Sequence, residues 1–106
     1  MQAFAALGDP TRQRIVEMLA ARELSSGEIA QRFDMTAPAV SQHLKLLREA
    51  GLVQVRREAQ RRIYALDPAG LAELDAWLAR FRCFWSERLD PLAHELEHHD
   101  HRKTTR

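Results

Sequence analysis

The chain contains one cysteine among its 106 residues, Cys83, and therefore cannot form an internal disulfide. A lone thiol is typical of a protein from a reducing compartment, so we expect a cytoplasmic location. No apolar run approaches the roughly 20 residues needed to cross a membrane. The N-terminal MQAFAALGDP lacks the basic and apolar segments of a secretory signal. We therefore expect no membrane partner.

Catalytic motifs are also missing. The sequence has no glycine-rich phosphate loop, no nucleophile elbow and no paired carboxylates in a plausible cleft. The H-E-x-x-H string of zinc proteases does occur, from His94 to His98, but it ends eight residues before the C-terminus. No third ligand follows in a second structural element, as a catalytic zinc site requires. The sequence therefore predicts that the protein is not an enzyme and needs no cofactor.

Charge is unevenly distributed along the chain, although the net charge is only +1. Six basic and two acidic side chains lie between residues 42 and 62, which gives this segment a net charge of +4. Residues 67–100 carry eight acidic and three basic side chains, a net charge of −5. This segregation indicates that only the middle of the chain faces a polyanion.

Capping signals divide the first half of the chain into short helices. Asp9 is an N-cap residue followed by proline, and Ser25 with Glu28 has the spacing of a capping box. Thr36 caps a further helix, which Gly51 ends. The expected helices lie at about 3–7, 11–21, 26–33 and 37–49, with Leu24 in a short strand.

The hydrophobic period changes after residue 52. Apolar side chains alternate from Val53, and a second alternating segment follows a turn at residues 58–60, which predicts a β-hairpin. A long helix then begins near Asp67, with apolar residues spaced by three and four as far as Leu96, and Pro91 breaks or kinks it. The fold class is mainly α with a small β-hairpin. We expect one domain over residues 1–98 and a polar, disordered tail at 99–106.

The helix predicted at 37–49 has two unlike faces. Val40, Leu44 and Leu47 have the i, i+4, i+7 spacing of a core face. The opposite face is short and polar, as required of a helix whose backbone approaches base edges in the DNA major groove. Together with the helix before it, this pattern predicts a helix-turn-helix. The residues expected to contact DNA here are Thr36, Ala37, Pro38, Ser41, Gln42, His43 and Lys45.

These side chains suit different parts of the duplex. Gln42 can bind adenine through two hydrogen bonds, Ser41 a base or a phosphate, and Lys45 a phosphate. His43 either contacts phosphate or forms a hydrogen bond within the helix-turn-helix. The hairpin is basic, as expected of a wing that reaches the adjacent groove or backbone, and its arginines are Arg56, Arg57, Arg61 and Arg62.

Two other binding classes stay open for these elements. One is a winged helix that binds a protein and not DNA, which the four arginines disfavour. The other is an architectural protein that binds DNA without sequence preference, which the near-neutral net charge disfavours.

Several segments resemble the ArsR/SmtB family of bacterial winged-helix repressors. They are ALGDPTRQRIVEML (6–19), LSSGEIAQRF (24–33), APAVSQHLKLLREAGLV (37–53) and RREAQRRIYALDP (56–68), and the resemblance extends over residues 1–98. It implies a winged helix-turn-helix with the recognition helix at 37–48 and the wing at 56–62. It also implies a homodimer, built from the first and last helices, that represses a promoter until a signal arrives.

The residues support dimerisation independently. The last predicted helix carries an aromatic-rich stripe with more apolar surface than a small monomer easily covers. A two-fold dimer places its recognition helices about one turn of DNA apart, so the operator should be pseudo-palindromic. The residues expected at the dimer interface are Phe4, Leu74, Trp77, Leu78, Phe81, Phe84, Trp85 and Leu89.

The sequence gives several candidates for the signal that would release such a repressor from DNA. Many family members bind metals through Cys-x-Cys near the recognition helix, but residues 33–39 contain no cysteine here. His94, His98 and His101 share one helical face and are candidate zinc or nickel ligands of a metal-responsive repressor. A solvated histidine-rich tail is the favoured alternative, so no metal is assigned. Cys83 is expected to be a small packed residue, with redox sensing as an alternative. The inducer, whether a small molecule, a redox event or none, stays open.

Overall fold

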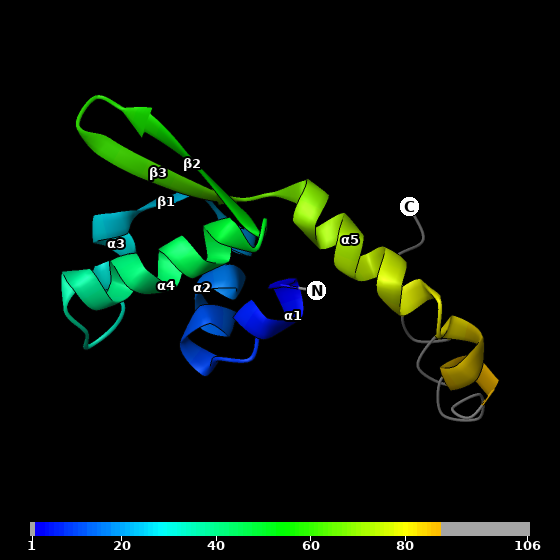
Figure 1. Cartoon of the computed structure of the whole chain (residues 1–106). Coiled ribbons are helices and arrows are strands. Elements are labelled where there is room, and N and C mark those ends of the chain that lie inside the picture. Colours follow the sequence, from blue (N-terminus) through cyan, green and yellow to red (C-terminus); the bar gives the residue numbers. More distant parts are fainter. Residues whose placement is uncertain (1, 88–106) are drawn as a thin grey trace, which may run out of the picture. The chain divides into compact units, whose positions relative to one another are not determined.

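The computed structural model describes residues 2–87, whose labelled helices and strands run from α1 to α5 (Figure 1). In chain order they are α1 (Gln2–Ala6), α2 (Pro10–Ala21), β1 (Leu24–Ser25), α3 (Ser26–Gln31), α4 (Ala37–Glu49), β2 (Val53–Glu58), β3 (Arg61–Leu66) and α5 (Pro68–Ala79). The chain divides into two compact units, one ending at Leu74 and the other beginning at Asp75. No helix within residues 2–87 combines the length and apolar character needed to cross a membrane.

The predicted N-caps are all present. The carboxylate of Asp9 accepts a hydrogen bond from the backbone N–H of Arg12 at 3.1 Å. Ser25 and Glu28 form the reciprocal bonds of a capping box, at 3.1 and 2.8 Å. The hydroxyl of Thr36 accepts from the N–H of Ala39 at 3.3 Å. Each cap satisfies a backbone donor that the helix itself cannot pair, and so fixes where α2, α3 and α4 begin.

The first unit has one hydrophobic core, to which every element from α1 to the start of α5 contributes. Val40, Leu44 and Leu47 of α4 are almost completely buried, which confirms the predicted core face of that helix. The other buried members of the cluster are Ala3, Ala6, Ile15, Met18, Leu19, Leu24, Ile29, Leu52, Val53, Tyr64 and Leu74. This core holds α4 by one face and leaves the other exposed.

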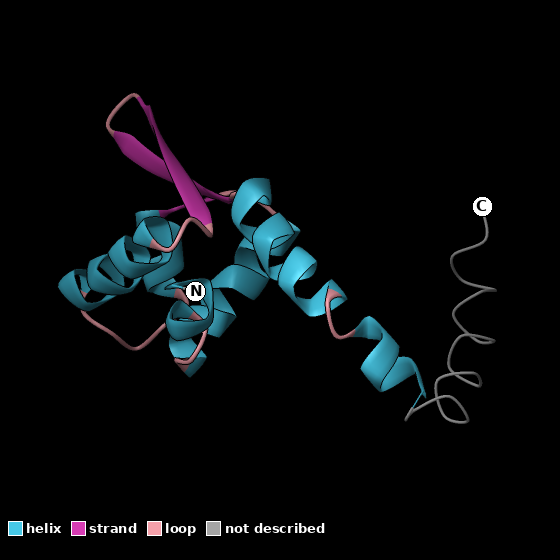
Figure 2. Cartoon of the chain, turned by 45° about the vertical axis from the view of Figure 1, so that its right-hand side comes forward, coloured by secondary structure: helices cyan, strands magenta, loops and turns pink. Residues whose placement is uncertain are grey.

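The predicted hairpin is present and belongs to a three-stranded antiparallel sheet of order β1-β3-β2. Strand β1 pairs Leu24 with Tyr64 and Ser25 with Ile63. Strands β2 and β3 are joined by the two-residue turn Ala59-Gln60, with Ala59 at a positive φ of 58°. In both views the hairpin projects beyond helices α1–α4 of the same unit (Figures 1 and 2).

A glycine turn connects α4 to the hairpin. The N–H of Leu52 donates to the carbonyl of Leu47, and the N–H of Gly51 donates to that of Arg48, both at 3.0 Å. With Gly51 at φ +79°, these two bonds form a Schellman motif. Gly70 of α5 packs directly on this turn, because a Cβ at Gly70 would overlap the carbonyl group of Gly51.

The last helix differs from the prediction. A continuous helix from residue 68 to Pro91 was expected, but α5 ends at Ala79 and a second helical segment covers 82–87. At the interruption, Arg80 and Phe81 donate their N–H groups to the carbonyls three residues earlier, at 3.2 and 3.0 Å. Such i→i+3 bonds tighten the last turn and end the α-helical pattern. Neither proline nor glycine lies there, so the sequence carries no signal of the break. The helix expected at 26–33 is also shorter and ends at Gln31.

Candidate nucleic-acid interface

The exposed face of α4 carries the predicted DNA-contacting residues. Ala37, Pro38, Ser41, Gln42 and Lys45 are all exposed, opposite the buried face of the same helix. The α3–α4 pair packs as a helix-turn-helix, with α3 set against α4 by the buried side chain of Ile29. Thr36 is exposed, but its hydroxyl already serves as the N-cap. The arrangement presents short side chains at the first turn and longer polar ones one turn later.

Two of the four wing arginines are held by acidic residues. Arg56 forms ion pairs with Glu23 at 2.8 Å and Glu58 at 3.2 Å, and these hydrogen bonds raise its pKa. Arg61 lies 3.3 Å from the Glu28 carboxylate. Both guanidinium groups therefore have partners within the fold, which sequence reasoning did not anticipate.

The other two wing arginines face each other across the hairpin. Arg57 and Arg62 are direct cross-strand partners, and both are exposed. Within residues 2–87 neither of them forms an ion pair. They continue the row of Val55 and Tyr64, which is the face of the sheet that covers the core. Like charges placed directly opposite on a hairpin destabilise it unless an anion lies against them.

Glu28 links the wing to the helix-turn-helix. Its carboxylate accepts from the Ser25 N–H, lies 3.3 Å from Arg61 and lies 3.8 Å from Arg22. The backbone hydrogen bond from Ser25 is the main cause that lowers the pKa of Glu28, and the two arginines add to it. The capping-box spacing revealed this residue in the sequence, but only the fold shows that the same carboxylate also holds the wing.

His43 lies on the side of α4 that faces α2. Its ring Nδ1 is 3.2 Å from Nη1 of Arg12 and 3.9 Å from the carboxylate of Asp9, and the side chain is only 18% exposed. Of the two roles considered for His43, this position favours the hydrogen bond within the domain. Contact with phosphate stays an untested prediction.

Comparison with known proteins identifies the family. The family model for bacterial regulatory proteins of the arsR family matches residues 9–55, which run from the cap of α2 into β2. The HTH-type transcriptional regulator Rv2034 of Mycobacterium tuberculosis is 46% identical over 96 residues, covering 91% of this chain and 87% of the relative. The chain belongs to the ArsR family. The transcriptional repressor SdpR of Bacillus subtilis is 32% identical over 78 residues, covering 74% of this chain and 87% of the relative.

A solved structure supports the same assignment. A possible transcriptional regulator for arsenical resistance shares 39% identity and superposes with a TM-score of 0.71, covering 90% of this chain and 96% of the other. The winged helix-turn-helix fold predicted from the sequence is therefore confirmed. As an ArsR-family member the chain is a DNA-binding transcriptional regulator, and the prediction that it is not an enzyme is confirmed too.

The residues predicted at an ArsR-type dimer interface occupy different environments. Leu74 is buried in the core of its own chain, which leaves it little surface for a second copy. Phe4, Trp77, Leu78, Phe81 and Phe84 are exposed, and Trp85 is half-buried. The rings of Trp77 and Phe81 are stacked at a tilt, with centroids 4.6 Å apart. Leu89 lies outside the described residues.

The candidate sensing residues of this ArsR-family chain give no site within the described part. Residues 2–87 contain no group of three or more histidine, cysteine or acidic side chains placed to hold a metal ion. His94, His98 and His101 lie outside that range. Cys83 is exposed, so the prediction of a packed thiol is wrong. That prediction rested on the place of Cys83 next to the aromatic stripe, whose members Phe81 and Phe84 are themselves exposed.

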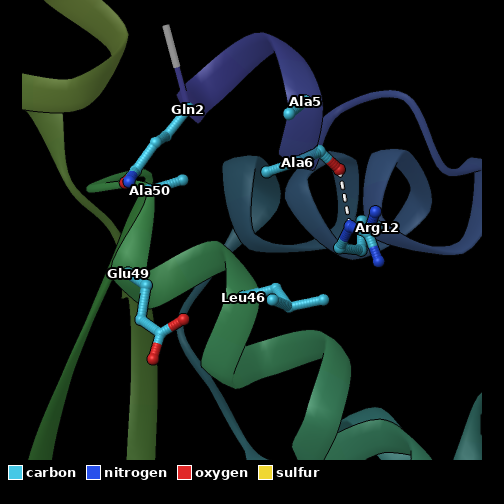
Figure 3. Close-up of a pocket in the computed structure, with 7 residues that line it drawn as sticks. All are labelled: Gln2, Ala5, Ala6, Arg12, Leu46, Glu49 and Ala50. Atoms are coloured by element: carbon cyan, nitrogen blue, oxygen red, sulfur yellow. Dashed lines mark hydrogen bonds between the residues drawn. The ribbon is translucent and has the colours of Figure 1, made fainter.

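An open cleft of about 290 Å³ lies between α1, the start of α2 and the end of α4 (Figure 3). Its walls are mainly apolar, with polar groups at the edge. The lining residues are Gln2, Ala5, Ala6, Arg12, Leu46, Glu49 and Ala50. Arg12 closes one side of the cleft, where its Nε donates to the carbonyl of Ala6 at 2.6 Å.

Proposed function

We propose that this protein is a homodimeric, sequence-specific transcriptional repressor that acts in the bacterial cytoplasm on a pseudo-palindromic operator. The observation that carries the proposal is the two-faced α4, anchored by Val40, Leu44 and Leu47 and exposing Ser41, Gln42 and Lys45. An element with this construction suits insertion into the major groove.

Different exposed side chains of α4 serve base recognition and phosphate binding. Ala37 and Pro38 keep the first turn slim, so that the backbone can approach the groove floor. Gln42 lies on the next turn and is suited to a bidentate contact with adenine, which discriminates between base pairs by roughly 1–3 kcal/mol. Lys45 lies three residues further along and is suited to a phosphate, where it adds affinity without sequence preference.

The wing adds phosphate contacts through Arg57 and Arg62. These two arginines are exposed, adjacent and without acidic partners among the described residues, whereas Arg56 and Arg61 are occupied by carboxylates. A phosphate against the pair would relieve their mutual repulsion. We therefore assign the wing contact to Arg57 and Arg62 and give Arg56 and Arg61 a supporting role.

Dimerisation follows from the aromatic residues beyond Leu74. Trp77, Phe81 and Phe84 are between 37% and 57% exposed, which is unusual for large aromatic side chains gathered within eight residues. A second copy is the occupant that two-fold operator recognition requires. The repressor SdpR among the relatives supports repression as the outcome, since a dimer bound over a promoter excludes the polymerase.

The test is DNA binding by the full chain, with footprinting of its own promoter region and a random duplex as the competitor. Gln42→Ala should lower the preference for the protected site over random DNA by roughly tenfold or more, while Lys45→Ala should weaken both duplexes equally. Each variant is the matched control for the other, since Gln42 and Lys45 lie on the same exposed face of α4. Equal loss on both duplexes for Gln42→Ala would contradict the base contact. Absence of any protected site would contradict sequence-specific repression.

The dimer is tested separately by mass in solution. Trp77→Glu and Phe81→Glu place a charge in the proposed interface and should yield a monomer that binds a half-site weakly. An unchanged dimer mass in both variants would place the interface elsewhere.

A further inference from the structure

The side chain of Arg12 in α2 contacts both α1 and the recognition helix α4. Nε of Arg12 donates to the carbonyl of Ala6, the last residue of α1, at 2.6 Å (Figure 3). Nη1 of the same side chain lies 3.2 Å from Nδ1 of His43 in α4. The backbone N–H of Arg12 meanwhile bonds the carboxylate of Asp9, the N-cap of α2. Arg12 therefore fixes the position of α4 relative to α1 and α2.

The contact with Arg12 restricts the hydrogen-bonding role of His43. An arginine side chain only donates hydrogen bonds, so Nδ1 of His43 accepts from Arg12 only in the tautomer that carries its proton on Nε2. Protonation turns Nδ1 into a donor and places a positive charge beside Arg12. The Asp9 carboxylate is the available acceptor, 3.9 Å from Nδ1. Within residues 2–87, Arg12 is the hydrogen-bond partner of this ring and Asp9 its ion-pair partner, and both come from the start of α2.

A change in the hydrogen-bond partner of His43 from Arg12 to Asp9 requires atoms to move. The Asp9 carboxylate lies 3.9 Å from Nδ1, so the two groups must approach by about 1 Å before they can form a hydrogen bond. Asp9 is also the cap of α2, and its pKa is lowered chiefly by the hydrogen bond from the Arg12 N–H. The ring is attached to α4 immediately after Gln42, so any part of its displacement that the backbone takes up would also move the residue proposed to contact a base.

We propose that Arg12 and His43 are positioning residues for the recognition helix, and that protonation of His43 lowers the selectivity of the protein for its operator. The inference rests on the proposed placement of α4 in the major groove. The added positive charge strengthens binding to operator and random DNA alike. A movement of the helix is therefore detected in the ratio of the affinity for the operator to the affinity for random DNA.

The experiment measures affinity for the operator and for a random duplex between about pH 8 and about pH 5.5, at constant salt, with the full chain. This is the range in which histidine side chains take up a proton. The wild type should lose roughly tenfold of its operator preference on acidification, as expected for one hydrogen bond to a charged group. His43→Asn retains an acceptor near the Nδ1 position but cannot be protonated. It should match the wild type at about pH 8 and keep that preference in acid.

Further variants separate positioning from folding. His43→Ala should show the low preference at every pH, and Arg12→Lys should do the same, because lysine lacks the fork that serves Ala6 and His43 together. Thermal unfolding at each pH identifies any variant that does not fold, and His43→Asn remains the deciding variant if His43→Ala fails. The histidines of the C-terminal segment are present in all variants and therefore cancel.

The outcomes distinguish the two proposals. Identical pH profiles for the wild type and His43→Asn would overturn the role of His43 while leaving operator recognition intact. Failure of the wild type to prefer any operator at any pH would overturn the proposed function itself.

Discussion

Arg57 and Arg62 offer the sharpest separation between folding and DNA binding in this molecule. They are cross-strand partners of like charge, and within the described residues no carboxylate balances them. Replacing either one by alanine should leave the unfolding midpoint unchanged or slightly raised, because a repulsion is removed. The same replacement should weaken DNA binding. A residue whose loss improves the fold and impairs binding is retained for binding.

The magnitude follows from counterion release. Each phosphate contact contributes about 0.9 to the slope of log K against log salt concentration on duplex DNA. A dimer carries two wings, so Arg57→Ala should lower the slope by about 1.8, and the double variant with Arg62→Ala by about 3.6. The loss should be the same on operator and random DNA, since phosphate contacts carry no sequence information.

The assay is a salt titration of binding by fluorescence anisotropy, paired with thermal unfolding of the same samples. Arg56→Ala is the matched control, since it removes the same charge from the neighbouring residue of the same strand. It should lower the unfolding midpoint, because its bonds to Glu23 and Glu58 are lost, and should leave most of the salt slope intact. A slope change as large for Arg56→Ala as for Arg57→Ala would refute the distinction between paired and unpaired wing arginines.

Three further predictions concern the fold. Gly70→Ala should destabilise the protein by about 3 kcal/mol or prevent folding, because the new Cβ meets the Gly51 carbonyl; chemical denaturation measures this, and a loss below about 1 kcal/mol would contradict the close contact. Ala59→Gly should stabilise it by roughly 0.5–1 kcal/mol, since a positive φ suits glycine better, and the same measurement would show no gain if the turn were unstrained. The lowered pKa of Glu28 means that its contribution to stability is present above its usual value and lost as the pH falls through the lowered one. Unfolding midpoints should therefore fall in acid more steeply for the wild type than for Glu28→Gln, and parallel curves would contradict this.

The local signals in the sequence predicted most of the first unit. Asp9, Ser25 and Thr36 fixed three helix starts because a cap is a short-range interaction between residues three apart. Alternation predicted the hairpin, and the spacing of Val40, Leu44 and Leu47 predicted which face of α4 is buried. These features depend only on neighbouring residues, which is why a single sequence reveals them.

Contacts between distant residues were not predictable in this way. The pairing of Arg56 with Glu23 and the contact of Arg12 with His43 join positions more than 30 residues apart. No spacing rule selects which arginine of a basic hairpin finds a carboxylate. The interruption at residues 80–81 was missed for another reason, since the apolar stripe of the last helix continues across it without proline or glycine.

The short strand β1 has a consequence for the kind of operator this protein can accept. Its two residues pair with Tyr64 and Ile63 of the wing, while Ser25 also caps the first helix of the helix-turn-helix. Strand β1 therefore ties the wing to the helix-turn-helix, and we expect this link to set the distance along the DNA between their contacts. Inserting one base pair within a half-site should abolish binding, even where every contacted base is kept.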